Sequence, residues 1–165
     1  MNYKYCPECG SKLILKEIGD EGLVPFCNSC KKAYFDVIHP CILAAVVNEF
    51  GEVALLKQDF KRITNWALVS GFVKKGETLE DTVIREVKEE TGQEVEELKY
   101  ISSYYAGEKD LIMAGFVAFV KKKEFIKSKE ILDINWFSPD EALNTLIEGS
   151  IAKSLFKKII ELKIV

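Results

Sequence analysis

The chain has 165 residues, enough for one full-sized domain and a small appendage. It is 48% hydrophobic and 30% charged, which is ordinary for a soluble globular protein, and its net charge of −3 implies no general affinity for nucleic acid. No apolar run approaches the roughly 20 residues that span a bilayer, and the N-terminus lacks the apolar core of a signal peptide. We therefore expect a cytoplasmic protein that makes no membrane contact.

Four of the five cysteines form two pairs near the N-terminus. Cys6-x2-Cys9 and Cys27-x2-Cys30 are separated by seventeen residues, a spacing typical of a four-cysteine zinc site. The alternatives are free thiols or two disulfides, and disulfides are disfavoured in a reducing cytosol. Four protein ligands leave no position for water, so the zinc would be structural.

We expect residues 1–36 to form a zinc ribbon with a hairpin turn at residues 19–22 (Gly-Asp-Glu-Gly). A segment of this size buries too little core to fold alone, so its folding should be coupled to metal binding. Residues 37–165 then form a second domain. Its single histidine, His39, stands beside Pro40 and is expected to be structural.

The second domain begins with a predicted buried strand over residues 42–47. Cys41, directly before it, is expected to be a small buried hydrophobic residue. A turn then leads to a hairpin partner over 52–57. The polar stretch 57–65 is predicted to be a loop, and a short strand over 66–69 follows it.

The segment after this strand is a glycine-containing loop that runs into a helix. Thr78 can cap the helix, and Gly92 can end it in a left-handed conformation. Glu86, Glu89 and Glu90 lie at i, i+3 and i+4, so they share one face. Their mutual repulsion costs roughly a few tenths of a kcal/mol per pair. A hard cation with oxygen ligands, Mg²⁺ or Mn²⁺, would offset that cost.

The alternative is an ordinary solvated acidic helix face. The spacing of the whole segment argues against it, because it follows the Nudix box, Gly-x5-Glu-x7-Arg-Glu-apolar-x-Glu-Glu-x-Gly-apolar. The matching residues are Gly71, Glu77, Arg85, Glu86, Val87, Glu89, Glu90 and Gly92. Only Gln93 departs, standing where the family has an apolar residue, and this departure concerns packing after the helix. The chain therefore resembles the Nudix hydrolases, which implies an α/β fold: an α/β/α sandwich with a mixed sheet.

The remaining predicted elements agree with that fold. Strands are expected at about 97–105, 111–121 and 132–137. Ser138 begins a helix, with a proline and a capping-box glutamate directly after it, and an amphipathic helix runs from about Ser150.

The order of the parts narrows the resemblance. A four-cysteine ribbon directly before a Nudix domain is similar to the NADH pyrophosphatase branch, whose members cleave the diphosphate of NADH and related dinucleotides. Some of them also remove NAD caps from RNA. Residues 39–42, 66–72 and 129–137 resemble that branch as well. Its Ser-Gln-Pro-Trp-Pro-Phe-Pro-x-Ser run is replaced here by residues 102–110, where only the first serine remains. NADH-like dinucleotides, ADP-ribose and nucleotide sugars thus all stay open as substrates.

The resemblance also implies catalytic roles. Glu86, Glu89 and Glu90 would bind Mg²⁺ or Mn²⁺, and Glu130, outside the box, would be a further metal ligand or the general base. Glu90 is the competing base. Divalent ions neutralise the diphosphate oxygens and lower the pKa of bound water. Arg85 would orient Glu86.

The other implied roles concern the loop and the substrate. Glu77 would brace Arg85 or the loop. Gly71, Phe72, Tyr104 and Tyr105 are candidate substrate-binding residues. Gly71 would let the backbone turn sharply at the cleft, and the tyrosines would stack on a base or nicotinamide ring.

The leading hypothesis is a Mg²⁺-dependent hydrolase of a diphosphate-linked nucleotide. The alternative is a binding module that senses a nucleotide while the ribbon docks RNA or protein. Nudix domains that bind without cleaving usually lose box carboxylates, and this chain keeps all of them. The ribbon can also simply stiffen the enzyme or take part in a homodimer interface.

Overall fold

The computed structural model describes residues 3–58, 65–107 and 110–165, so most of the loop predicted over 57–65 lies outside the described residues. The chain divides into two compact units, Met1–Ile38 and His39–Val165, two residues beyond the boundary expected from the sequence. We describe each unit by itself.

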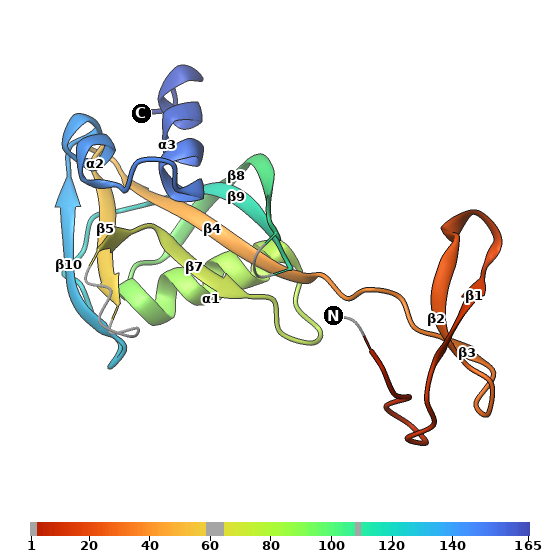
Figure 1. The fold of residues 1–165 in the computed structure, drawn as a ribbon. Helices are drawn as coiled ribbons and strands as arrows, with labels where there is room; N and C mark the ends of the chain where they lie inside the picture. Colours follow the sequence, from red (N-terminus) through yellow and green to blue (C-terminus); the bar gives the residue numbers. More distant parts are fainter. Residues whose placement is uncertain (1–2, 59–64, 108–109) are drawn as a thin grey trace. The chain divides into compact units, whose positions relative to one another are not determined.

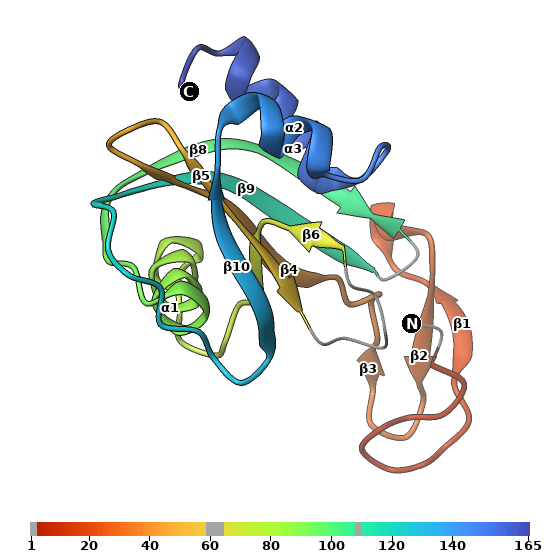
Figure 2. The ribbon, with the colours of Figure 1, turned by 90° about the vertical axis from the view of Figure 1, so that its left-hand side faces the viewer.

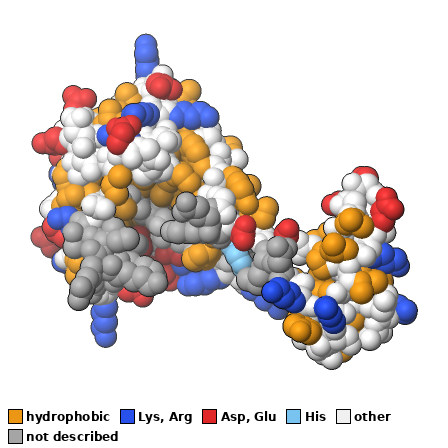
Figure 3. Space-filling model, in the orientation of Figure 1, with side chains coloured by type: hydrophobic (Ala, Val, Ile, Leu, Met, Phe, Trp, Pro, Cys, Tyr) orange, Lys and Arg blue, Asp and Glu red, His pale blue; other side chains and the backbone are white. Residues whose placement is uncertain are grey.

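The small unit is a three-stranded antiparallel sheet. β1 (Ile14–Glu17), β2 (Leu23–Cys27) and β3 (Lys32–Ala33) follow one another in that order. A single 3-10 turn, η1 (Gly19–Glu21), joins β1 to β2 where a hairpin turn was predicted. The buried apolar residues of β2 are few, and β1 is exposed along its whole length. Figure 3 shows hydrophobic side chains at the surface of this unit. So small a core agrees with a unit that needs a metal to fold.

The large unit is built on a seven-stranded mixed sheet (Figure 1). The strand order is β10-β5-β4-β9-β8, with β6 paired to β5 and β7 paired to β4. Only the β4–β9 pair is parallel among the described pairs. The strands are β4 (His39–Asn48), β5 (Val53–Gln58), β6 (Trp66–Ala67), β7 (Val69–Phe72), β8 (Val95–Ala106), β9 (Leu111–Val120) and β10 (Ile131–Phe137).

Helices cover both faces of this sheet. α1 (Leu79–Thr91) lies on one face, and α2 (Pro139–Thr145) and α3 (Ile151–Glu161) lie on the other (Figures 1 and 2). The predicted α/β/α sandwich with a mixed sheet is thus confirmed. No helix among the described residues is long and apolar enough to cross a membrane.

Strand β4 lies in the middle of the sheet and is buried on both faces over most of its length. Its alternate residues enter two different cores: Ile42 and Val46 pack on the α1 side, while Leu43 and Val47 pack on the α2 and α3 side. Side chains alternate along a strand, so a strand covered on both faces reads as one continuous apolar run. This explains why the sequence over 42–47 shows no alternation.

One predicted strand needed adjustment. The short strand expected over 66–69 is two strands, β6 and β7, which pair with different neighbours. Leu68 lies between them and is buried in the α2-side core. The partner of each strand is set by distant parts of the chain, which a local pattern does not contain.

Candidate functional site

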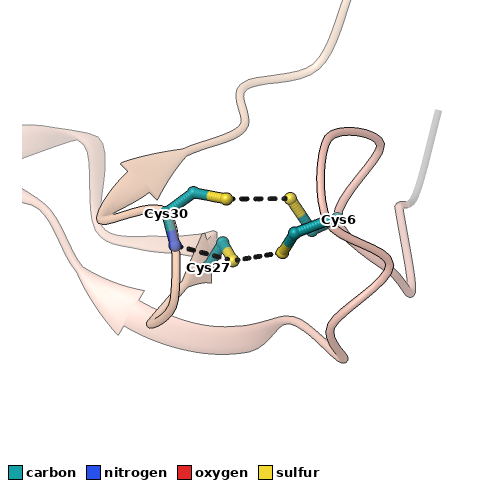
Figure 4. Close-up of side chains that lie close together, drawn as sticks. Cys6, Cys27 and Cys30 are labelled. Atoms are coloured by element: carbon teal, nitrogen blue, oxygen red, sulfur yellow. Dashed lines mark hydrogen bonds between the residues drawn. The ribbon is translucent and has the colours of Figure 1, made fainter.

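The four cysteine sulfurs of the small unit lie together (Figure 4). All four Sγ atoms are within 4.8 Å of one another; the Cys6–Cys30 pair is 3.8 Å apart and the Cys9–Cys27 pair 3.6 Å. A disulfide bond would measure about 2.05 Å. Tetrahedral zinc with Zn–S bonds of about 2.3 Å requires sulfurs roughly 3.8 Å apart. The donor set therefore fits a structural zinc ion.

Polar groups surround these sulfurs. The Tyr34 hydroxyl lies 3.0 Å from Cys6 Sγ, and the Cys30 N–H donates to Cys27 Sγ at 3.3 Å. Burial raises the pKa of the Cys6 thiol, but the hydrogen bond from Tyr34 and nearby backbone amides outweigh it and lower that pKa to about 6. These surroundings favour the thiolate, the form that zinc binds, at Cys6, whereas the hydrogen bond with Cys9 and burial raise the pKa of Cys30 to about 12.

Helix α1 is held firmly at both ends. Thr78 Oγ1 accepts from the Asp81 N–H while the Asp81 carboxylate accepts from the Thr78 N–H, a complete capping box. Gly92 ends the helix with φ of 74°, as predicted. Val83 and Val87 pack into the core directly beside the acidic face. The acidic face is therefore carried on a rigid element.

The three carboxylates of this face differ in depth. Glu90 is only 8% exposed, Glu86 is largely covered, and Glu89 is half exposed. All three offer carboxylate oxygens, the donors that Mg²⁺ and Mn²⁺ prefer, so the donor chemistry fits a hard divalent cation.

Arg85 connects three carboxylates and the backbone of β7. Its Nε and Nη2 donate to the two oxygens of Glu77 at 2.6 and 2.9 Å, and its Nη1 donates to Glu86 and, at 3.2 Å, to Glu89. Nη2 also donates to the Phe72 carbonyl at 3.1 Å. The hydrogen bonds from Arg85 lower the pKa of the Glu77 carboxyl to about 2. The guanidinium thus fixes the loop before α1 to the helix.

Gly71 is needed for a reason that the sequence did not indicate. It lies inside β7 and has no left-handed backbone, so the expected sharp turn is wrong. A Cβ at this position would lie 2.0 Å from Oε1 of Glu86. Only glycine lets Glu86 approach the strand this closely.

Glu130 stands apart from α1. It lies in a turn before β10 that the Ile131 N–H to Ser128 carbonyl bond closes, and its side chain is exposed. Within the described parts of the chain, the cysteine cluster is the only metal-binding group of three or more His, Cys, Asp or Glu side chains. Glu130 and the α1 carboxylates are therefore not brought into one preformed cage, although Mg²⁺ usually keeps several waters and needs few protein ligands.

The candidate substrate-binding aromatics fall on two faces of the sheet. Phe72 pairs with Cys41, Cys41 with Met113, and Met113 with Tyr104, so these four side chains form one row on the α2 and α3 face. Tyr105 points to the α1 face and is 61% exposed. The two tyrosines therefore cannot stack on the same ring.

Gln93 is a residue whose importance the sequence only hinted at. It is completely buried, and its amide forms hydrogen bonds with the backbone of Lys123 and Glu124. The available signal was a polar residue at the one box position where the family has an apolar one.

Comparisons with known proteins agree with this geometry. Residues 37–157 match the model of the NUDIX domain. A Pectobacterium carotovorum subsp. carotovorum protein named NAD-capped RNA hydrolase NudC is 31% identical over 98% of the chain and 61% of its own length. The protein of that name from Vibrio vulnificus is 31% identical over 94% of the chain and 58% of its own length. The chain thus spans about three fifths of the length of these curated relatives.

Solved structures share the fold. A NUDIX hydrolase from Nitrosomonas europaea superposes with a TM-score of 0.75 at 22% identity, covering 96% of this chain and 91% of that one. The NUDIX domain of Shewanella oneidensis NrtR, solved with ADP ribose, gives a TM-score of 0.67 at 15% identity, covering 84% and 94% of the two chains. With the box, the fold and the family model in agreement, the chain belongs to the Nudix hydrolase family.

Proposed function

We propose that this chain is a Mg²⁺- or Mn²⁺-dependent pyrophosphatase that cleaves the diphosphate of a nucleoside diphosphate linked to another group. The observation that carries the proposal is the Arg85 network. It holds Glu77 and Glu86 in place beside a complete set of box carboxylates on one rigid helix. Nudix domains that bind without cleaving usually lose box carboxylates, whereas this chain keeps all of them.

Each residue then has a physical task. Glu86, Glu89, Glu90 and Glu130 would hold the divalent ions, which when bound neutralise the diphosphate and supply a more acidic water. Arg85 and Gly71 fix the position of Glu86 against β7. Glu90, the most buried of the α1 carboxylates, and Glu130 are the two candidates for the base that accepts the proton of the attacking water.

The substrate class is the finer part of the proposal. The names of the curated relatives favour an NAD cap on RNA. The resemblance to the NADH pyrophosphatase branch favours a free dinucleotide. Either Phe72 and Tyr104, on the α2 and α3 face, or Tyr105, on the face of α1, would contact the base or nicotinamide ring. Because the chain carries a net charge of −3, we expect a small dinucleotide to be preferred over capped RNA.

The four-cysteine site completes the proposal for the small unit. We infer that it binds zinc and that the protein works in a reducing compartment such as the cytoplasm, because the sulfurs must stay reduced to bind the ion.

Product analysis tests this function. The purified protein is incubated with Mg²⁺ and an equimolar mixture of NADH, ADP-ribose and a UDP-sugar. AMP with reduced nicotinamide mononucleotide would place it with dinucleotide pyrophosphatases, and AMP with ribose 5-phosphate would mean that residues 102–110 have changed the pocket. No product with either Mg²⁺ or Mn²⁺ would refute the hydrolase and favour a nucleotide-sensing binding module.

A further inference from the structure

The side-chain amide of Gln93 behaves like a peptide group of a β-ladder. Its Nε2 donates to the Lys123 carbonyl at 3.1 Å and to the Glu124 carbonyl at 3.4 Å, and its Oε1 accepts from the Lys123 N–H at 3.1 Å. The residue is 0% exposed. Both the donor and the acceptor of Lys123 are thus satisfied by one side chain, which fixes the register of the segment after β9.

Two further contacts hold the segment after β9 against the C-terminal end of α1. The Ile126 N–H donates to the Thr91 carbonyl at 3.0 Å, and a Cβ on Gly92 would lie 2.7 Å from Cβ of Ile126. The segment between β9 and β10 therefore packs directly against the C-terminal end of α1, and Figure 2 shows it passing beside that helix. Thr91 is the residue directly after Glu90.

These contacts lie close to Glu130 along the chain. Glu130 is four residues beyond Ile126, so their Cα atoms are at most about 14 Å apart. Residues 125–131 are held in place by two further contacts. The ring of Phe125 stacks on that of Trp136 in β10, with their centroids 4.9 Å apart, and a backbone hydrogen bond closes the turn at 128–131. The segment that leads to Glu130 is thus held at three places: by Gln93 at Lys123, by Thr91 at Ile126 and by Trp136 at Phe125.

We propose that Gln93 is a positioning residue that sets where Glu130 stands relative to Glu89 and Glu90 on α1. This inference rests on the proposed function. An apolar residue at this position would fill the same space but would leave the Lys123 N–H and C=O without the Gln93 amide, and the start of the segment would be held less firmly against the end of α1. The polar departure from the box is therefore part of how this chain aligns its separated carboxylates.

The test is the variant Gln93→Met, which keeps the length and volume of the side chain and removes its hydrogen bonds. Mn²⁺ binding is measured on the full chain without nucleotide, from the electron paramagnetic resonance signal of free Mn²⁺. Steady-state kinetics with the best substrate of the panel give kcat and KM. We expect Mn²⁺ affinity and kcat each to fall roughly tenfold, the lower end of the range seen when groups that orient metal ligands are removed, with KM unchanged.

Ile159→Val is the matched control, since it weakens the core on the opposite face of the sheet without touching α1 or the segment after β9. It should lower Tm and leave Mn²⁺ affinity intact. If Gln93→Met also lowers only Tm, Gln93 is purely structural and the inference is wrong. A wild-type protein that binds Mn²⁺ but hydrolyses nothing would refute the proposed function, while the Mn²⁺ comparison would still decide the role of Gln93.

Discussion

At the scale of single residues, the candidate site depends on close approach. Glu86 fits against β7 only because Gly71 has no side chain, and Arg85 reaches Glu77, Glu86 and the Phe72 carbonyl from one guanidinium. A planar group with several fixed donors suits this task, whereas a lysine ammonium would not. Small changes of geometry at these residues should therefore affect turnover more than they affect folding.

Gly71→Ala tests that statement. Its Cβ would meet the Glu86 carboxylate, so Glu86 must move away from β7. We expect kcat to fall at least tenfold while the circular dichroism spectrum stays that of the wild type. Gly51→Ala is a control for backbone strain alone: nothing lies near its added Cβ, but its φ of 78° disfavours alanine, so it should lower Tm and leave kcat unchanged. Unchanged kcat in Gly71→Ala would show that Glu86 need not hold this position.

Tyr34 offers a second test at this scale. Its hydroxyl is 3.0 Å from Cys6 Sγ, and a hydrogen bond to a ligand sulfur reduces the charge concentrated on a four-thiolate site. Tyr34→Phe should weaken zinc binding by roughly tenfold in competition with a chromophoric chelator. Tyr5→Phe, an exposed tyrosine next to Cys6, should leave zinc affinity unchanged. Equal affinities in both variants would show that the hydroxyl is not needed.

At the scale of elements, the sequence predicts features that depend on neighbouring residues, such as helix ends. It does not predict features that depend on which strands pair. Thr78 and Gly92 bound α1 as predicted, because capping depends on neighbours only a few residues away. The opposite faces of Tyr104 and Tyr105, and the partner of Gln93 thirty residues away, depend on strand pairing that no local pattern encodes. The roles of the carboxylates, including that of Glu130, remain predictions.

The ion pair between Glu77 in the loop and Arg85 on α1 should make the stability of the protein depend on pH in acid. The pKa of Glu77 is about 2, against its usual 4.5, so its contribution to stability is complete above pH 4.5 and is lost as the pH falls toward 2. Thermal melts across this range should therefore show a smaller loss of Tm on acidification for Glu77→Gln than for the wild type. Parallel curves for the two proteins would contradict the pairing with Arg85.

At the scale of the whole molecule, the two units should differ in how they depend on metal. The large unit has two buried cores, whereas the small unit has few buried residues and a cysteine cluster of zinc geometry. The sequence predicted this division from cysteine spacing and from the amount of core that each part can bury.

Zinc removal tests the division. A strong chelator should unfold residues 1–38 and leave the large unit folded, because metal binding supplies the folding free energy of small metal domains. Amide hydrogen exchange measured along the chain would then rise in the small unit alone. Protection that persists there after chelation would mean that the ribbon folds without the ion.

The central claim is that the acidic face of α1 holds the ions of a diphosphate hydrolase. The most direct measurement is the Mg²⁺-dependent hydrolysis rate of wild type, Glu89→Gln and Glu90→Gln, with Glu80→Gln, an exposed glutamate elsewhere on the same helix, as control. We expect Glu80→Gln to keep the wild-type rate and the other two variants to lose turnover while remaining folded. Full activity in both Glu89→Gln and Glu90→Gln would contradict the account.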